Sequence, residues 1–454
     1  MLLTLRPFRP PFRRMARAAA LSMGLMLAAC ASDRAPAPPV LADAAPPVYD
    51  YPFTNPWAAT VLGTPAEMRA SFPATVEPER RRLTVFEDRK VPDGFWYHDG
   101  LYYTALLQER RAPLAFVIAG TGADDRAEHM LSLGRMLHAI GMHVVLLPSP
   151  THANFVVTAS SSYLPGRPQQ DAADLLRVMR LLRDRIGKEV EISDHYLTGY
   201  SLGAWNAAYT AKLDQEQAAA GGGGFGFKRV LLINPPASLY RSVTKIDGML
   251  YRGLPGGINQ LDAFLDQLLA RLSEAYENTD ALDFGNEDLA MDIYRTLDPS
   301  DERLAAAIGL SFRLASANMV FASDVMSREG YIYPRNKPFL TTTPLSEYFA
   351  VALRTSFLNY FDDVYTDHYR ARTPGLTAQA LIDQSSLSSI GGWLAAQPQI
   401  GLMTNADDVI LAPGDLEELR GIFGARARIF PTGGHVGNLE HRAVTAHVLD
   451  FFTK

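Results

Sequence analysis

Short apolar runs alternate with amphipathic helical segments along this chain, and this alternation restricts the fold classes open to it. Continuous apolar runs at residues 114–119, 143–147 and 230–233 are typical of strands buried on both faces. Between them, apolar residues recur at helical spacing, as in the segment 171–186. Buried strands that alternate with helices predict an α/β fold, in which helices flank a mostly parallel central sheet.

The strand pattern stops near residue 238 and resumes near residue 397. Further strands are predicted before and after this break, at residues 83–86, 101–106, 195–198, 400–403 and 427–430. Within 238–396 the pattern is helical; Thr343 and Pro344 are expected to open one helix that continues through Phe361. We therefore expect a core at 49–237 and 397–454, with a large helical cap or lid inserted at 238–396. A packed domain without a role at the site is the alternative for this insertion.

A Gly-x-Ser-x-Gly pattern at residues 199–203 joins a predicted strand to an alanine-rich helical run. A serine on such a sharp strand-to-helix turn presents its hydroxyl above the sheet. Because the pattern occurs by chance in about one chain of this length in seven, its setting carries the argument. The segment resembles the nucleophile elbow of the α/β-hydrolases. That resemblance implies the α/β-hydrolase fold, with Ser201 as the nucleophile.

A serine hydroxyl needs a base to accept its proton and a carboxylate to orient that base. In the family that the elbow resembles, the order along the chain is serine, acid, histidine. His435 follows one predicted core strand, and Asp407 and Asp408 follow another. The resemblance therefore implies a triad of Ser201, His435 and one of the two aspartates. Asp408 is narrowly preferred because it leaves less chain before the next helix, and Asp407 stays open.

The tetrahedral intermediate of acyl transfer needs two donors for its oxyanion. The resemblance implies the backbone N–H of Leu202, which follows the nucleophile, as one donor. The second is expected from the loop after the strand at 114–119, where Gly120, Thr121 and Gly122 stand in place of the family's His-Gly pattern. We expect the N–H of Thr121 to serve, with Gly122 as the next candidate. A plain tight turn is the alternative.

The N-terminal segment is expected to be a signal peptide. Residues 1–29 contain five arginines and an apolar stretch that is too short to require a spanning helix. The stretch ends in Leu-Ala-Ala-Cys, which resembles a bacterial lipobox and implies lipidation of Cys30, the only cysteine. Ala31 follows where lipoproteins retained on the inner membrane usually carry Asp, so the resemblance implies the outer membrane. The Ala- and Pro-rich segment 30–48 is expected to be a tether. An ordinary cleaved secretory signal is the alternative.

Charge and composition exclude several kinds of partner. Removal of residues 1–29, with five arginines and no acid, changes the formal net charge from −6 to −11. An acidic body argues against nucleic acid as a partner, and it makes the lipid the expected membrane contact. The histidines show no metal-ligand spacing and the chain has no phosphate-binding loop, so no metal or cofactor is expected. His152 is expected to be a solvated loop histidine, and the sequence does not determine the oligomeric state.

These features together predict a membrane-anchored serine hydrolase that cleaves an ester or related acyl bond through an acyl-enzyme. The insertion is rich in Leu, Phe and Tyr, which favours an apolar pocket for a small-molecule or lipid-like acyl substrate. A peptidase or an acyltransferase on the same triad is an alternative, because a triad does not by itself determine the reaction. A non-catalytic envelope lipoprotein that uses the fold for interaction is the alternative of a different class.

Overall fold

One compact unit, Asp43–Lys454, contains every residue whose structure is described; Met1–Ala42 form the other unit of the chain. The computed structural model describes residues 47–72, 77–254, 256–264, 266, 294 and 299–454. The predicted signal peptide, Cys30 and the tether up to residue 46 therefore lie outside the described residues. Packing begins at Tyr49, whose hydroxyl donates to the carbonyl oxygen of Thr432 at 2.6 Å.

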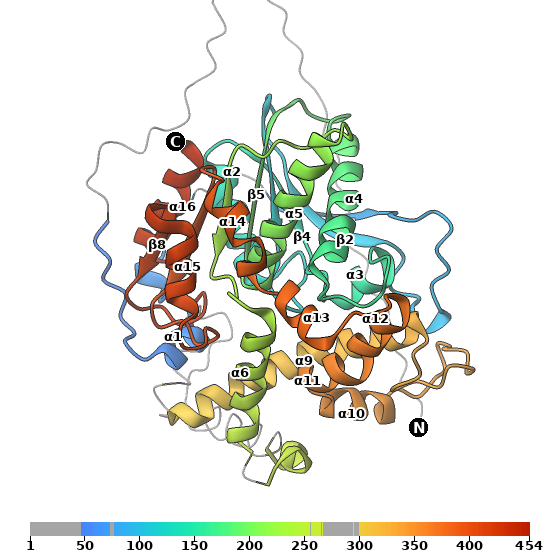
Figure 1. Cartoon of the computed structure of the whole chain (residues 1–454). Helices are drawn as coiled ribbons and strands as arrows, with labels where there is room; N and C mark the ends of the chain where they lie inside the picture. The colour runs from blue at the N-terminus through green and yellow to red at the C-terminus, as the bar shows by residue number, and fades with distance from the viewer. Residues whose placement is uncertain (1–46, 73–76, 255, 265, 267–293, 295–298) are drawn as a thin grey trace, which may run out of the picture. The chain divides into compact units, whose positions relative to one another are not determined.

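Among the described residues, eight strands form a single sheet in the order β1-β2-β4-β3-β5-β6-β7-β8 (Figure 1). The strands are β1 Glu79–Leu83, β2 Leu101–Leu106, β3 Ala112–Ile118, β4 His143–Leu147, β5 Ile192–Tyr200, β6 Val230–Ile233, β7 Ile400–Asn405 and β8 Ala427–Phe430. β2 runs antiparallel to both of its neighbours, and every other neighbouring pair is parallel. This mostly parallel sheet, with a sharp turn into a helix after β5, confirms the predicted α/β-hydrolase fold.

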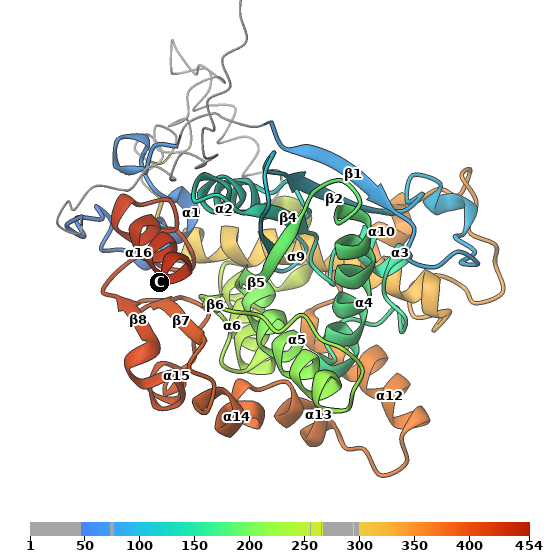
Figure 2. The same ribbon diagram turned by 90° about the horizontal axis from the view of Figure 1, so that it is seen from above.

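Helices cover both faces of the sheet and fill the insertion. The α-helices are α1 Pro56–Leu62, α2 Glu128–Ala139, α3 Ala153–Thr158, α4 Pro168–Ile186, α5 Leu202–Ala219, α6 Leu239–Arg252, α9 Asp301–Ser327, α10 Ser346–Arg354, α11 Phe357–Asn359, α12 Thr366–Arg372, α13 Ala378–Gln384, α14 Gly391–Ala395, α15 Asp415–Phe423 and α16 Arg442–Thr453. Figure 2 shows α4 and α5 on one face of the sheet and α2 and α16 on the other.

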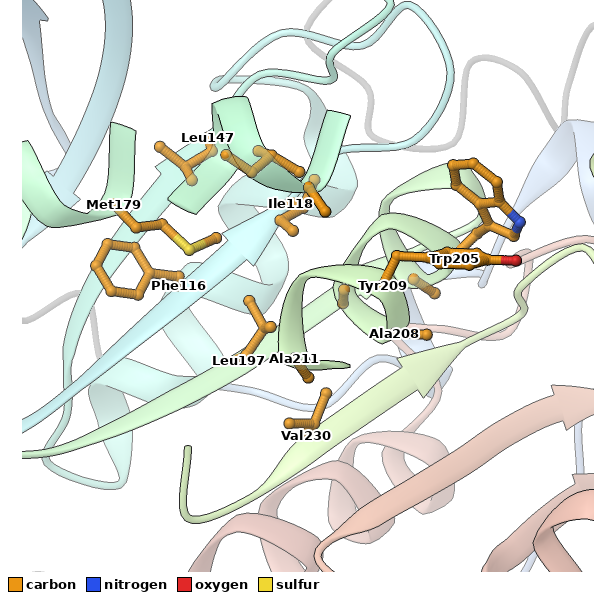
Figure 3. Close-up of a cluster of buried hydrophobic side chains, with 14 of the residues drawn as sticks. Phe116, Ile118, Leu147, Met179, Leu197, Trp205, Ala208, Tyr209, Ala211 and Val230 are labelled. Atoms are coloured by element: carbon orange, nitrogen blue, oxygen red, sulfur yellow. The ribbon is translucent and has the colours of Figure 1, made fainter. Parts of the chain in front are cut away.

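The pleat of each core strand directs alternate side chains into two separate cores. In β3, Phe116 and Ile118 belong to the core beneath α4 and α5, whereas Val117 belongs to the core beneath α2 and α16. Figure 3 shows part of the first core, in which Phe116 lies in one cluster with Met179 of α4 and Trp205 of α5. Burial on both faces explains why these strands are continuous apolar runs in the sequence.

The insertion between β6 and β7 contains no strand among its described residues. Figure 1 shows α6 and α9 to α13 gathered at one end of the sheet. α9 has 27 residues, and its most apolar 18-residue stretch has a mean hydropathy of 1.5. Among the described helices it alone is long and apolar enough to cross a membrane. However, 67% of this 18-residue stretch is buried inside the protein, which is typical of the core helix of a domain. A buried ion pair between Asp247 of α6 and Arg313 of α9, with 2.8 Å between nitrogen and oxygen, joins the two helices.

The predicted helix that opens at Thr343 and Pro344 is wrong in both its start and its length. α10 begins at Ser346 and ends at Arg354, and the next residue, Thr355, has an extended backbone. A capping box, in which Ser356 and Asn359 bond each other's backbone N–H groups, starts a new helical segment. The apolar spacing continued across this break because both segments pack on the same interior, so periodicity alone could not locate it.

Two further differences lie at the start of the sheet. The first strand is Glu79–Leu83 rather than 83–86, because an edge strand with mostly polar side chains lacks the apolar pattern of a buried strand. The short helix α3, Ala153–Thr158, was not predicted at all. It follows Pro150 closely and is too short for helical periodicity to be recognised.

Candidate active site

Ser201 occupies a strained turn between β5 and α5. Its backbone has φ 55° and ψ −127°, a conformation that costs a residue with a side chain about 1–3 kcal/mol. The flanking glycines allow the turn to close. A Cβ atom on Gly203 would lie 2.0 Å from the carbonyl oxygen of Ile118, and one on Gly199 would lie 2.5 Å from the backbone of Gly203. The glycines of the pattern are therefore required by close backbone approach, and this packing keeps Ser201 in its strained turn at the end of the sheet.

Three residues from separate loops meet at this turn. Nε2 of His435 lies 2.8 Å from Oγ of Ser201, and Nδ1 lies 3.0 and 3.1 Å from the two carboxylate oxygens of Asp408. A carboxylate only accepts hydrogen bonds, so this pattern assigns the ring proton to Nδ1 and leaves Nε2 to accept from Ser201. The Asp408 side chain is fully buried and that of His435 is 9% exposed, so water competes little for these bonds.

Asp407 has a different set of contacts from its neighbour. Its two carboxylate oxygens accept the backbone N–H groups of Gly434 at 2.9 Å and Gly433 at 3.1 Å. Burial raises the pKa of this carboxyl, and the two N–H donors oppose that rise. Of the two adjacent aspartates, Asp408 therefore contacts the imidazole ring, whereas Asp407 holds the backbone of the loop that carries His435.

Asn234 supports the carboxylate of Asp408, and the sequence analysis did not find it. Its Nδ2 donates to Oδ2 of Asp408 at 2.8 Å, while the backbone N–H of Ile410 donates to Oδ1 at 3.1 Å. Asn234 directly follows β6 and has a positive φ of 48°. A polar residue immediately after a buried apolar strand was the available signal, because ligand-binding groups gather at the carboxyl ends of parallel strands.

The loop of His435 rests on α1, an element that the sequence analysis also did not predict. The backbone N–H of His435 donates to Oγ1 of Thr60 at 2.9 Å. A Cβ atom on Gly437 would lie 1.9 Å from the carbonyl oxygen of Ala59, so this part of the loop needs glycine for its close approach to α1. Asn55 caps α1 and is followed by proline, which is a recognisable start signal for a helix.

The loop after β3 lies against Ser201. A Cβ atom on Gly120 would be 3.2 Å from the Cβ atom of Ser201, so only a backbone without a side chain passes the nucleophile this closely. Among the described residues, the backbone N–H groups of Thr121 and Leu202 have no hydrogen-bond acceptor. Both residues line the same cavity. These two N–H groups are therefore available to an oxyanion formed beside Ser201.

Gly122, the second candidate donor in this loop, is already engaged. Its N–H donates to Oγ1 of Thr151 at 2.8 Å, and that hydroxyl lies 2.8 Å from Oγ of Ser149. A Cβ atom on Gly122 would lie 2.5 Å from the Cβ atom of Ala315 in α9, so the insertion packs directly on this loop. Thr151, which the sequence analysis did not single out, thus holds the loop in place, while the N–H of Thr121 stays free.

A mostly apolar cavity of about 620 Å³, measured with its open mouth, begins beside these N–H groups. Thr121, Thr151 and Leu202 come from the core, and most of the remaining lining comes from the insertion. The largest insertion side chains are Tyr240, Met319, Phe357, Tyr360, Phe361 and Tyr365. The arrangement places an apolar space next to a nucleophile and two unpaired N–H donors.

His152 differs from its predicted solvated position. It caps α3, where Nδ1 accepts the backbone N–H of Asn154 at 3.3 Å, and burial lowers its pKa. It is not among the described residues that line the cavity. No cluster of three or more His, Cys, Asp or Glu side chains that could hold a metal ion occurs within the described part of the chain.

Comparisons with known proteins give similar folds at low sequence identity. No family model matches the chain, and no curated protein matches it. A thioesterase domain from the curacin biosynthetic pathway is 15% identical with a TM-score of 0.37, and the match covers 84% of this chain and 100% of that domain. A hydrolase from Pseudomonas aeruginosa is 14% identical with a TM-score of 0.38, over 83% of this chain and 99% of that one. Esterase B from Lactobacillus rhamnosis is 13% identical with a TM-score of 0.40, over 84% of this chain and 86% of that one. At these values the likeness carries no argument about activity, which depends on the geometry of the site.

Proposed function

We propose that this protein is a serine hydrolase that cleaves an ester or a related acyl bond. The observation that carries the proposal is the continuous chain of contacts from Asp408 through His435 to Ser201, with 2.8 Å between Nε2 and Oγ. In the first step His435 accepts the hydroxyl proton while Oγ attacks the acyl carbon. The N–H groups of Thr121 and Leu202 donate to the oxyanion that forms.

Collapse of the tetrahedral intermediate breaks the bond to the leaving group, which takes its proton from the His435 imidazolium. The acyl group is then bonded to Oγ of Ser201. His435 next accepts a proton from water, whose oxygen attacks the acyl carbon. The bond between the acyl carbon and Oγ then breaks, Oγ takes the proton back from His435, and the carboxylic acid is released. Asp408 keeps the ring oriented and stabilises its charged form in both halves of the cycle.

The cavity supports an apolar acyl group as the substrate part that is held next to the scissile bond. Its lining is mainly aliphatic and aromatic and it begins at Thr121 and Leu202. Apolar surface that enters such a cavity is removed from water, which favours binding by about 0.8 kcal/mol for each CH₂ group. We therefore expect hydrolysis of p-nitrophenyl esters to improve with acyl-chain length until the cavity is full.

A fluorophosphonate probe tests the nucleophile directly, because it reacts with activated serines. We expect the wild-type protein to be labelled and Ser201→Ala to remain unlabelled. Ser346→Ala is the matched control, since this serine is exposed at the start of α10, and it should be labelled like the wild type. Labelling of Ser201→Ala, or an unlabelled wild type beside a reactive control hydrolase, would contradict the proposal. The second result would favour a non-catalytic envelope protein.

We also propose that lipidation of Cys30 anchors the protein to the outer membrane. The proposal rests on the basic, apolar and Cys-terminated segment 1–30. Cys30→Ala should leave the chain without a lipid and move it from the membrane to the soluble fraction. The outcome against this proposal is a Cys30→Ala protein that stays with the membrane after a high-salt wash.

A further inference from the structure

A second hollow, of about 870 Å³ with its open mouth, lies on the far side of the cavity wall. Tyr365 lines the apolar cavity and Tyr369 lines the hollow, and their rings are 4.7 Å apart. Likewise Gly166 lines the cavity, whereas Arg167 lines the hollow. In Figure 1, α12 lies below α3 and α4. The apolar cavity and the hollow are thus separated by the same few residues.

The described lining of the hollow is cationic. It contains the guanidinium groups of Arg167 and Arg372 and the imidazole of His368, and no carboxylate. Arg167 stacks on the ring of Tyr369 with 4.6 Å to its centroid, and Arg372 donates to the carbonyl oxygen of His368 at 3.0 Å. Neither guanidinium has a carboxylate partner within the described part of the chain.

The two guanidinium groups lie close enough to His368 to favour its neutral form. Burial lowers the pKa of His368, and Arg372 and Arg167 lower it further, while Glu329 opposes the change. Glu329 accepts from Nδ1 of this ring at 2.7 Å and is the acid nearest to the cluster by contact. Glu329 thus contacts His368 and Arg335, and it forms no ion pair with Arg167 or Arg372.

Two further acids lie close to the hollow. Asp174 accepts the backbone N–H of Ser161 at 2.8 Å and pairs with Arg177, and the second acid is Asp171. Its Oδ2 accepts the N–H of Gly166 at 2.8 Å, and complete burial raises its pKa well above the usual range. The lining also contains hydroxyl-bearing residues, namely Ser161, Ser162 and Ser327.

We propose that this hollow binds a phosphate-type oxyanion, either free phosphate or the phosphate of a lipid headgroup. The planar guanidinium fork matches the spacing of phosphate oxygens, and charge-assisted bonds of this kind are about twice as strong as neutral ones. Arg167 and Arg372 supply the charge. The inference goes beyond the proposed function and does not depend on it, since it concerns binding at a separate space.

The first experiment measures phosphate binding to the full chain. Inorganic phosphate is titrated by calorimetry at constant ionic strength, with chloride as the balancing anion. We expect saturable binding to the wild type and an affinity about tenfold lower in Arg372→Gln and in Arg167→Gln. Arg370→Gln is the matched control, because Arg370 is exposed on the same helix but outside the described lining, and it should bind like the wild type. Arg372 is itself exposed, so its variant remains informative if Arg167→Gln fails to fold.

The second experiment distinguishes the two sources of phosphate. The full-length Cys30→Ala chain, which lacks the expected lipid, is floated with phosphatidylcholine vesicles that contain or lack phosphatidylglycerol. Binding to phosphatidylglycerol that Arg372→Gln abolishes, without measurable binding of inorganic phosphate, assigns a lipid headgroup. Saturable binding of inorganic phosphate alone assigns the free anion. The proposal is overturned if neither ligand binds, or if Arg370→Gln loses as much binding as Arg372→Gln.

Discussion

Replacement of Asp408 by asparagine tests the contact between this carboxylate and His435. The Asp408 carboxylate accepts from Nδ1 of His435, Nδ2 of Asn234 and the backbone N–H of Ile410. An amide has only one accepting oxygen. If that oxygen faces His435 and Ile410, the new NH₂ group meets the NH₂ group of Asn234. If the amide is reversed, its NH₂ group faces Nδ1 and forces the ring proton onto Nε2, which then cannot accept from Ser201.

The expected magnitude follows from this loss of the correct tautomer. Loss of the acid's charge and orientation in such a triad lowers turnover by about 10³- to 10⁴-fold, or about 4–5 kcal/mol in activation free energy. The free energy of unfolding should fall by only about 1–3 kcal/mol, the cost of one unsatisfied buried donor. Asp408→Asn should therefore fold but hydrolyse esters very slowly.

The matched comparison is Asp407→Asn, assayed by p-nitrophenyl ester hydrolysis with folding followed by circular dichroism. Its amide oxygen can still accept one of the two N–H groups of Gly433 and Gly434, so we expect less than about a tenfold loss of kcat. A second arm combines Asp408→Asn with Asn234→Asp. This double variant restores an acceptor for the new NH₂ group and should recover about tenfold of the lost activity. The reasoning is refuted if Asp407→Asn loses more activity than Asp408→Asn while both remain folded.

Three further predictions concern the surroundings of the site. Thr151→Val removes the acceptor for Gly122 and should lower kcat about tenfold with little change in KM for the same esters. Arg313→Met strands the buried carboxylate of Asp247 and should cost about 3–5 kcal/mol of unfolding free energy in urea. Because burial already raises the pKa of Asp247, that loss should grow as pH rises above the ordinary aspartate range, and an equal loss at pH 4 and pH 8 would contradict it. Met319→Trp fills the cavity and should shift the preferred p-nitrophenyl ester to a shorter chain; an unchanged preference would argue against this cavity as the acyl site.

Much of the core could be predicted from local patterns, because its strands are buried on both faces. His143–Leu147, Val230–Ile233 and Ala427–Phe430 have the predicted bounds, since a continuous apolar run in a chain of alternating elements has few other interpretations. The edge strand Glu79–Leu83 was misplaced because one of its faces is polar. The breaks within the insertion were missed because the apolar spacing runs across them. Apolar periodicity therefore locates fully buried strands well, but it locates edge strands and helix breaks poorly.

The residue types of the candidate site and their order along the chain also followed from the sequence, since each lies next to a strand end. Which of Asp407 and Asp408 contacts His435 could not be determined from the sequence. Adjacent residues share the same local pattern, and only the path of the backbone directs one carboxylate to His435 and the other to Gly433 and Gly434.

The supports of the site and the second hollow arise from contacts between residues that are far apart in the chain. Thr60 meets His435 across 375 positions, and Asn234 meets Asp408 across 174. Tyr360 and Tyr369 of the insertion likewise donate to backbone carbonyl oxygens in the loop before α4. A local pattern records which face of an element is apolar, because burial selects side chains one at a time. It does not record which distant element covers that face. Here that packing determines which carboxylate contacts His435, and it brings Arg167 and Arg372 to the same hollow.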